Sequence, residues 1–422
     1  MSTPIVITGF GCTTALASQA MATWQAIKDG RSGVRPISQW DTSDWDYPMA
    51  AELADYQPRQ MVEDRKILKL ISRHDTIGLG AVKQALQHSE LLTARQQLED
   101  AREFNDRTGV FVGSPGNKFN QQYDFMSLLS KAQGDMAQFA KYLFDEVHPM
   151  WLLRILPNNV LAYTAMQYEL RGSNHNVTNH GVSGLQAILL AQYYLQAGHI
   201  DRAVVVGYDV AFEPQGMFYY GNSGLLSSQA IKSFDQQRDG TVLGEGAGAL
   251  VLETKQAALQ RQATIYGEIL AGSSTCEAQG VLSLSDEANE LVRCLQQTLD
   301  QAQVGQRDVG MVTAHGNGNK KSDATEAAAL TQLFSSQALP VTAFKWALGH
   351  TLAASGVIDT IMTLLALREQ VVPGIATLTT PAKDCAGLAV SAETQTPQSS
   401  LGLVISRGFG SLNASLLMKA VT

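Results

Sequence analysis

Two histidines on glycine-rich turns are the residues of this sequence best suited to chemistry. His315 follows the apolar run 309–312 and opens a glycine turn, and His350 follows Gly349 just before a helical stretch. A neutral imidazole placed in a cleft can donate a hydrogen bond to a developing oxyanion or enolate. A single histidine of this kind is more often structural. Two on matched turns in the same half of the chain favour a functional site.

Two more glycine-rich stretches accompany the histidines. The segment 233–248 reads SFDQQRDGTVLGEGAG, which favours a structural loop around a buried cluster of ion pairs. The segment 406–415 places Phe409 between two glycines, where the ring is either a mobile gate or a packed aromatic.

The elements that position these turns alternate between strand and helix. Apolar β-branched runs predict strands, and apolar residues at helical spacing predict helices. In the first half the expected strands are 5–7, 203–207 and 247–252, and a helix follows Gly184 as far as Gly198. The second half repeats this plan, with strands at 263–270, 309–312, 401–406 and 414–419 and helices at 286–302, 323–334 and 354–368. The alternation predicts an α/β fold built from two similar halves, 1–255 and 256–422, with a helical insertion at 116–152 in the first.

The glycine-rich stretches resemble the signature motifs of the β-ketoacyl synthases of the thiolase superfamily. Residues 315–326, 345–356, 233–248 and 408–413 are similar to H-G-T-G-T-x-x-x-D-x-x-E, K-x-x-x-G-H-x-x-G-A-x-G, F-D-x-x-R-D-G-F-V-x-G-E-G-A-G and G-F-G-G-x-N, in that order. The start of the chain and Leu-Pro-Asn-Asn at 156–159 fit as well, so the resemblance covers nearly the whole sequence. It implies a duplicated five-layered αβαβα thiolase-like fold and a dimer formed along an edge strand near 174–178.

The resemblance also implies roles for individual residues. It makes His315, His350 and Lys345 the catalytic residues, supported by the set Asp323, Glu326, Phe409 and Asn413. It implies neither a metal nor a bound cofactor, because substrates of the family are carried on the phosphopantetheine of acyl carrier protein (ACP).

The position of the family's nucleophilic cysteine is occupied by glycine. The motif T-A-C-x-[ST]-G corresponds to Asn-His-Gly-Val-Ser-Gly at 179–184, which places Gly181 at the cysteine position. Glycine has no side chain with which to form an acyl-thioester. Ser183 is a poor substitute, since an offset of two residues turns it about 200° around the helix, and Cys12 is expected to be a small buried residue. We expect Gly181→Cys to restore acylation only in part.

Several functions remain open for such a chain. Changes at 179, 180, 317, 319 and 411–412 accompany the lost cysteine and favour a natural non-condensing subunit, most like a chain-length factor. Such a subunit forms a heterodimer or heterotetramer with an active ketosynthase. One alternative is a β-ketoacyl-ACP synthase whose cysteine was replaced by glycine. Another is a malonyl-ACP decarboxylase that uses the two histidines, with the backbone N–H groups of residues 181 and 409 as an oxyanion hole.

Composition excludes other classes of protein. The net charge of −8 and the absence of basic runs argue against a nucleic-acid partner. One local basic group is either an ACP docking site or a solvated helix face: Arg65, Lys66, Lys69 and Arg73. The four cysteines are scattered, which argues against disulfides or a zinc site. The sequence shows neither a signal peptide nor an apolar run of ~18 residues, so a cytoplasmic protein without a membrane span is expected.

Overall fold

The computed structural model describes residues 3–116, 118, 123–335 and 338–421. The first half of the chain contributes the strands β1 (Ile5–Thr13), β4 (Thr108–Gly113), β5 (Asn174–Val177), β6 (Arg202–Val210) and β7 (Glu245–Thr254). The second half contributes β8 (Gly267–Cys276), β9 (Met311–Thr313), β10 (Pro340–Thr342), β11 (Ala389–Val390), β12 (Leu401–Gly408) and β13 (Leu412–Ala420). The short strands β2 (Arg35–Pro36) and β3 (Met49–Ala50) pair separately.

The two halves have the same strand order and the same strand directions. The first half runs β5-β4-β6-β7-β1, and the second runs β10-β9-β12-β13-β8, with β11 added at its outer edge. In each half the first three of these strands are parallel, and the last two pair antiparallel. Strands β1 and β8 pair with each other and join the halves. This repeated topology confirms the duplication predicted from the sequence.

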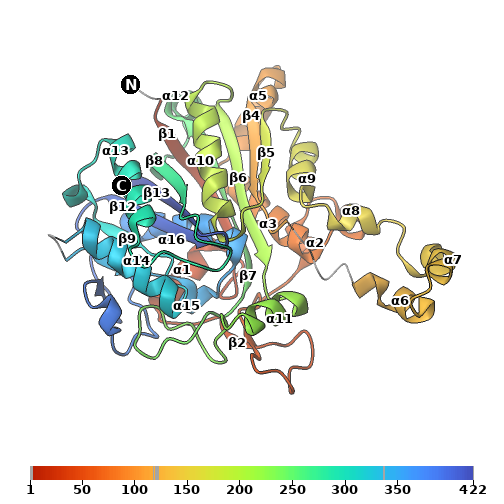
Figure 1. The fold of residues 1–422 in the computed structure, drawn as a ribbon. Coiled ribbons are helices and arrows are strands. Elements are labelled where there is room, and N and C mark those ends of the chain that lie inside the picture. Colours follow the sequence, from red (N-terminus) through yellow and green to blue (C-terminus); the bar gives the residue numbers. More distant parts are fainter. Residues whose placement is uncertain (1–2, 117, 119–122, 336–337, 422) are drawn as a thin grey trace.

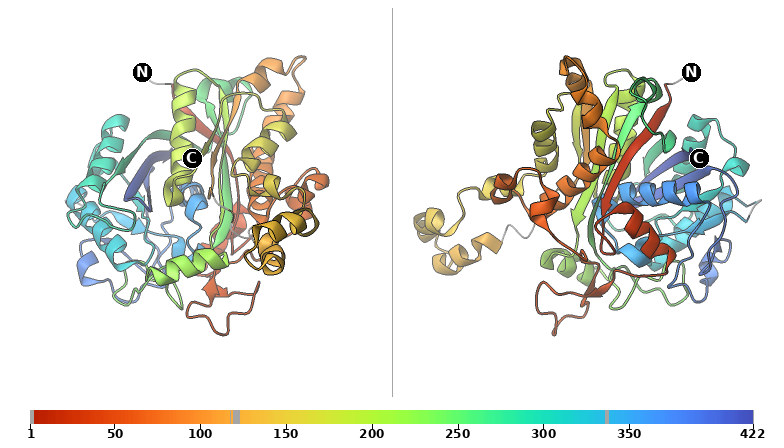
Figure 2. Two further views of the ribbon diagram at one scale, coloured as in Figure 1. Left: turned by 45° about the vertical axis from the view of Figure 1, so that its right-hand side comes forward. Right: turned by 180° about the vertical axis from the view of Figure 1, so that it is seen from behind.

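Helices form three further layers around and between the two halves of the sheet. The central layer consists of α10 (Ser183–Gln196) and α16 (Ser355–Glu369), which contact each other and strands of both halves. The outer layers are made chiefly by α3 (Arg73–His88) and α9 (Asn159–Tyr168) on one side and by α13 (Asn289–Ala302) and α14 (Lys320–Leu333) on the other (Figure 1 and Figure 2). Every residue of α16 from 355 to 367 is buried, as a helix between two sheets requires. The architecture is the αβαβα fold of the thiolases.

Most of the remaining helices are peripheral, and one group protrudes from the molecule. The peripheral helices are α1 (Ala20–Lys28), α2 (Pro58–Met61), α4 (Leu91–Gln96), α5 (Arg102–Asp106), α11 (Pro214–Asn222) and α12 (Lys255–Gln260). The short helix α15 (Lys345–Leu348) is buried along its whole length. The predicted insertion contains α6 (Met126–Ala132), α7 (Met136–Glu146) and α8 (Trp151–Ile155), and α6 and α7 form a hairpin that extends away from the body (Figure 1).

Two predicted strands differ most from those observed. The strand expected at 263–270 begins at Gly267 and continues to Cys276, and the first strand continues beyond residue 7 to Thr13. In both cases glycines interrupt the apolar pattern while pairing with neighbouring strands continues. Among the described residues, no helix is long and apolar enough to cross a bilayer.

Candidate active site

The two central helices begin in the same unusual way, and their first turns face each other. A short 3-10 turn precedes each helix, His180–Val182 before α10 and Leu352–Ala354 before α16. Each turn opens with a residue in the left-handed region, His180 at φ 53° and Leu352 at φ 39°. Such a conformation is rare for residues other than glycine and often marks functional sites. The duplicated fold therefore brings the cysteine position and the His350 turn together at its centre.

The turn that carries His315 is held by two buried carboxyl groups. The backbone N–H groups of His315 and Gly316 donate to Glu326 at 2.7 and 2.9 Å. Asp323 accepts from the N–H groups of Phe234 and Gly318 at 2.8 and 3.2 Å. Both carboxyls therefore position the turn and do not themselves enter the cavity.

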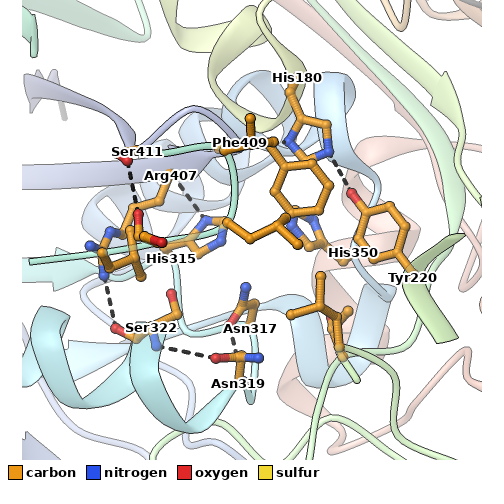
Figure 3. A pocket seen from close by; sticks show the side chains of 17 residues that line it. His180, Tyr220, His315, Asn317, Asn319, Ser322, His350, Arg407, Phe409 and Ser411 are labelled. Atoms are coloured by element: carbon orange, nitrogen blue, oxygen red, sulfur yellow. Dashed lines mark hydrogen bonds between the residues drawn. The ribbon is translucent and has the colours of Figure 1, made fainter. Parts of the chain in front are cut away.

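The two histidines lie close together with their Nδ1 atoms engaged. The Nδ1 atom of His315 accepts the backbone N–H of Arg407 at 3.2 Å, and that of His350 accepts the N–H of Leu352 at 3.3 Å. Their ring centroids are 5.1 Å apart (Figure 3). Burial and the nearby Lys345 ammonium hold the pKa of both imidazoles well below the ordinary value. Each ring is thus neutral with its proton on Nε2, ready to donate.

Lys345 is buried and paired with Asp359. Its Nζ lies 3.1 Å from Asp359 Oδ2, in a bond between α15 and α16. Burial raises the pKa of the Asp359 carboxyl, and the ammonium partly offsets that effect. Lys345 therefore supplies fixed positive charge behind the two imidazoles.

Gly181 is enclosed by backbone. A Cβ atom at this position would lie closer than 3.0 Å to the carbonyl oxygen of Arg407. The expectation that Gly181→Cys restores part of the acylation therefore meets a steric obstacle, because a carbonyl on a paired strand cannot rotate away. The structure also shows the surroundings of Ser183 and Cys12, the two residues considered as alternative nucleophiles. Ser183 accepts the N–H of Asn179 and donates to the carbonyl of His180, and Cys12 is buried with a pKa raised to about 12 by desolvation.

His180 is a site residue that the sequence reading missed. Its left-handed backbone directs the imidazole into the site, where the ring stacks on Phe409 with centroids 4.1 Å apart (Figure 3). Nδ1 accepts the backbone N–H of Phe409 at 3.2 Å, and Nε2 lies 2.5 Å from the hydroxyl of Tyr220. Burial lowers the pKa of His180 to about 4. A polar residue at 180 in place of the family's alanine was the available signal.

The contact with His180 corrects the predicted oxyanion hole. The N–H of Phe409 already donates to an imidazole, so residues 181 and 409 do not both offer a free donor. Phe409 itself is packed, because its ring also stacks on Tyr220 with centroids 5.1 Å apart.

Asn413 belongs to a buried network around Arg407, a second residue that the sequence reading did not single out. The Nε of Arg407 donates to Asn413 Oδ1 at 3.0 Å, and its Nη2 donates to Glu277 Oε1 at 2.9 Å. Asn413 Nδ2 donates to the same Glu277 oxygen at 3.0 Å. The network fixes the strand end whose backbone contacts His315 and Gly181.

Two cavities meet at the aromatic stack of His180, Phe409 and Tyr220. The first, of about 80 Å³, is lined by His315, His350, Asn317 and Asn319 (Figure 3). The second, of about 570 Å³, extends toward α11. The three stacked rings line both cavities, which adjoin at this point.

The predicted docking residues do not act as one group. Arg65, Lys66 and Lys69 are exposed on a 3-10 turn at 65–69. Arg73 instead makes two hydrogen bonds of 2.6 Å to the buried Glu245 and lies over the ring of Tyr56. Arg73 therefore contributes to the stability of the fold. The other three basic side chains of the predicted group remain exposed. The part of the chain that the structure describes holds no cluster of side chains suited to a metal ion.

Family models for the N-terminal and C-terminal domains of β-ketoacyl synthases match residues 2–258 and 266–379. The chain belongs to the β-ketoacyl synthase family. It is 28% identical over 431 residues to a protein of Coxiella burnetii named 3-oxoacyl-[acyl-carrier-protein] synthase 2, covering 99% of this chain and 98% of that one. A protein of the same name from Synechocystis is 28% identical over 425 residues, with coverage of 98% and 97%.

Solved structures share this fold. The ishigamide ketosynthase/chain length factor superposes with a TM-score of 0.88 at 25% identity, covering 100% of both chains. A β-ketoacyl synthase from Burkholderia phymatum gives a TM-score of 0.88 at 24% identity, again covering 100% of both chains.

Proposed function

We propose that this chain is a non-condensing, chain-length-factor-like subunit of a type II ketosynthase complex that elongates acyl or polyketide chains on ACP. The observation that carries the proposal is Gly181 at the entry of α10, where the family places its nucleophile. Acyl transfer of this kind needs a thiolate at that point. Neither Ser183, bonded on both sides to backbone, nor the buried Cys12 offers one.

The position of His180 supports the same conclusion. Its Nδ1 atom holds the Phe409 N–H that would otherwise stabilise an oxyanion. A thioester oxygen has to displace the imidazole to reach that donor. The crowding of a Cβ at residue 181 also argues against a synthase that lost its cysteine by a single change, because the backbone is closed around glycine.

Two surfaces suit a partner ketosynthase. Strand β5 lies at the edge of the sheet and pairs with β4 on one side, and edge strands are templates for pairing with another chain. The insertion helices and their flanks carry large exposed apolar side chains, which mark protein interfaces: Met126, Leu129, Met136, Phe144 and Leu152. An obligate interface buries more than ~2,000 Å² in total. The related ishigamide protein is named as a ketosynthase/chain length factor.

Co-expression with a cysteine-bearing ketosynthase encoded beside this chain tests the proposal. We expect the two chains to elute together from size exclusion as a heterodimer or heterotetramer. Phe144→Glu on the protruding hairpin should weaken the complex, whereas Leu259→Glu, an exposed apolar residue of α12, should leave it intact. Recovery of separate homodimers, with the partner's product length unchanged, would refute a chain-length-factor role.

A second candidate function is decarboxylation of malonyl-ACP. His315 and His350 both have Nδ1 bound by backbone N–H groups, so two neutral Nε2–H donors face the first cavity. Cleavage of the bond between the carboxylate and the α-carbon releases CO₂ and leaves an enolate that these donors stabilise. A proton from solvent then gives acetyl-ACP. Incubating the purified chain with malonyl-ACP and measuring acetyl-ACP by mass spectrometry tests this function. Activity that persists in His315→Ala would contradict the assignment.

In this proposal ACP is a direct binding partner that carries the acyl chain. Arg65, Lys66 and Lys69 form an exposed basic group that suits an acidic carrier protein. Arg73 does not belong to it, because its guanidinium is held by Glu245.

A further inference from the structure

Tyr220 carries a buried hydroxyl group at the point where the two cavities adjoin. The residue belongs to α11, is 6% exposed and lines both cavities. Its ring stacks on Phe409 and lies nearly parallel to the imidazole of His180, at 15°. A buried phenol usually finds a hydrogen-bond partner for its polar end. The direction of its bond to His180 decides which part of the hydroxyl group remains available.

The tautomer of His180 fixes that direction. Its Nδ1 atom accepts the backbone N–H of Phe409 and therefore carries no proton. Burial lowers the pKa of His180 to about 4, so at neutral pH the ring is neutral and its one proton lies on Nε2. Nε2 is consequently the donor in the bond to Tyr220, and the phenol oxygen is the acceptor.

The phenol proton is left for a different acceptor. Burial raises the pKa of Tyr220 well above its ordinary value, so the hydroxyl keeps its proton. Within the described part of the chain, His180 is the hydrogen-bond partner of this hydroxyl, and it uses the phenol only as an acceptor. A buried donor without an acceptor is costly. The O–H is therefore suited to an oxygen atom of a ligand in the cavity.

Other donors line the first cavity together with Tyr220. His315 and His350 offer their Nε2–H groups there, since backbone N–H groups occupy both Nδ1 atoms (Figure 3). A backbone donor at Phe409 is not free, because it is bonded to His180. Several neutral donors around one small cavity are complementary to a carbonyl oxygen or an oxyanion.

We propose that the Tyr220 hydroxyl donates a hydrogen bond to the thioester carbonyl of a carrier-bound ligand, in place of the Phe409 N–H that His180 occupies. His180 is then a positioning residue, because it holds the phenol oxygen and leaves the phenol proton free. In decarboxylation the same O–H stabilises the enolate oxygen alongside the two histidines. The proposal rests on the proposed function in one respect, since it takes the ligand to be the thioester of a phosphopantetheine carrier.

Carbon-13 NMR of a thioester probe on the isolated chain tests the proposal. The probe is acetyl-pantetheine labelled at the carbonyl carbon, and S-ethyl-pantetheine is the matched thioether without the acceptor oxygen. In the wild type we expect the carbonyl resonance to move downfield on binding. Tyr220→Phe removes only the hydroxyl and should reduce that shift. It should weaken thioester binding about two- to tenfold, as the loss of one neutral hydrogen bond does, and leave thioether binding unchanged.

Three further variants separate the hydrogen bond from packing. Tyr219→Phe removes an exposed hydroxyl from the same helix, outside the first cavity, and should leave the binding of both probes unchanged. His180→Leu frees the Phe409 N–H, so Tyr220→Phe should cost less in that background than in the wild type. His180→Gln should keep the wild-type cost, because its amide can accept from Phe409 and donate to Tyr220.

Three results would overturn the proposal. The first is the same carbonyl shift and thioester affinity in the wild type and in Tyr220→Phe. The second is a wild type that does not bind acetyl-pantetheine, and the third is an equal loss of thioether binding in Tyr220→Phe. Circular dichroism of each variant establishes that it is folded. Association with a ketosynthase is measured separately, and its failure would leave these binding results standing.

Discussion

Adding one methyl group at residue 181 tests the account of the closed active site. In Gly181→Ala the new Cβ meets the carbonyl oxygen of Arg407 at less than 3.0 Å, a separation that real Cβ atoms do not show. Overpacking of this kind costs about 1–3 kcal/mol. The backbone of residue 181 is not in the left-handed region, so the lower entropy of the unfolded chain returns about 0.4–1 kcal/mol. The net expectation is a loss of about 1–2 kcal/mol in the free energy of unfolding.

Urea unfolding followed by circular dichroism measures this loss. Gly80→Ala in α3 is the matched control, because the nearest atoms to its Cβ are the Cβ and Cγ of Met61 at 3.1 Å, a tight contact that stays outside the 3.0 Å limit crossed at residue 181. Removing a glycine from a helix gains about 0.5–1 kcal/mol, so the control should be neutral or stabilised. A Gly181→Ala protein as stable as the wild type would show that the site is not closed around glycine.

The same geometry predicts the chemistry of Gly181→Cys. Intact-protein mass spectrometry after incubation with an acyl-ACP donor should show no adduct on the wild type and none specific to the variant. A stoichiometric acyl adduct at position 181 would refute the steric reasoning and favour a synthase disabled by one substitution. The wild type controls for acylation of Cys276, which is exposed.

Three further predictions concern titration, docking and the buried network. Burial lowers the pKa of His180 to about 4 from an ordinary 6.5. Between pH 6.5 and 4 the imidazole is therefore protonated in the unfolded chain and neutral in the folded chain. Stability should therefore fall between pH 6.5 and 4, and His180→Gln should lose up to ~3 kcal/mol less over that range in urea titrations. Reversing three surface charges to Glu should weaken ACP binding in a salt-dependent way measured by titration, and unchanged affinity would return these residues to a solvated surface: Arg65, Lys66 and Lys69. Glu277→Leu leaves the Arg407 guanidinium buried without its carboxylate partner and should cost about 3–5 kcal/mol of unfolding free energy; a loss below 1 kcal/mol would contradict the burial of that pair.

The sequence predicted the two-half α/β plan because each half repeats the same order of apolar runs and turns. Glycines at strand ends, such as those beside His315 and His350, also predicted where the turns of the candidate site lie. These features are local, since they depend on the spacing of residues within about twenty positions. The helical insertion was visible for the same reason.

What the sequence by itself determined is the family and the duplicated fold, and it predicts that Gly181 stands at the position of the nucleophile, because each depends on residue types at fixed spacing. The tertiary structure alone decided which side chains lie around Gly181. It turns His180 inward through a left-handed backbone angle and brings Tyr220 and Phe409 against it from distant segments. It also removes Arg73 from the basic surface by pairing it with Glu245, 172 residues away. Such contacts join residues far apart in the chain, and their geometry exists only after the layers have packed.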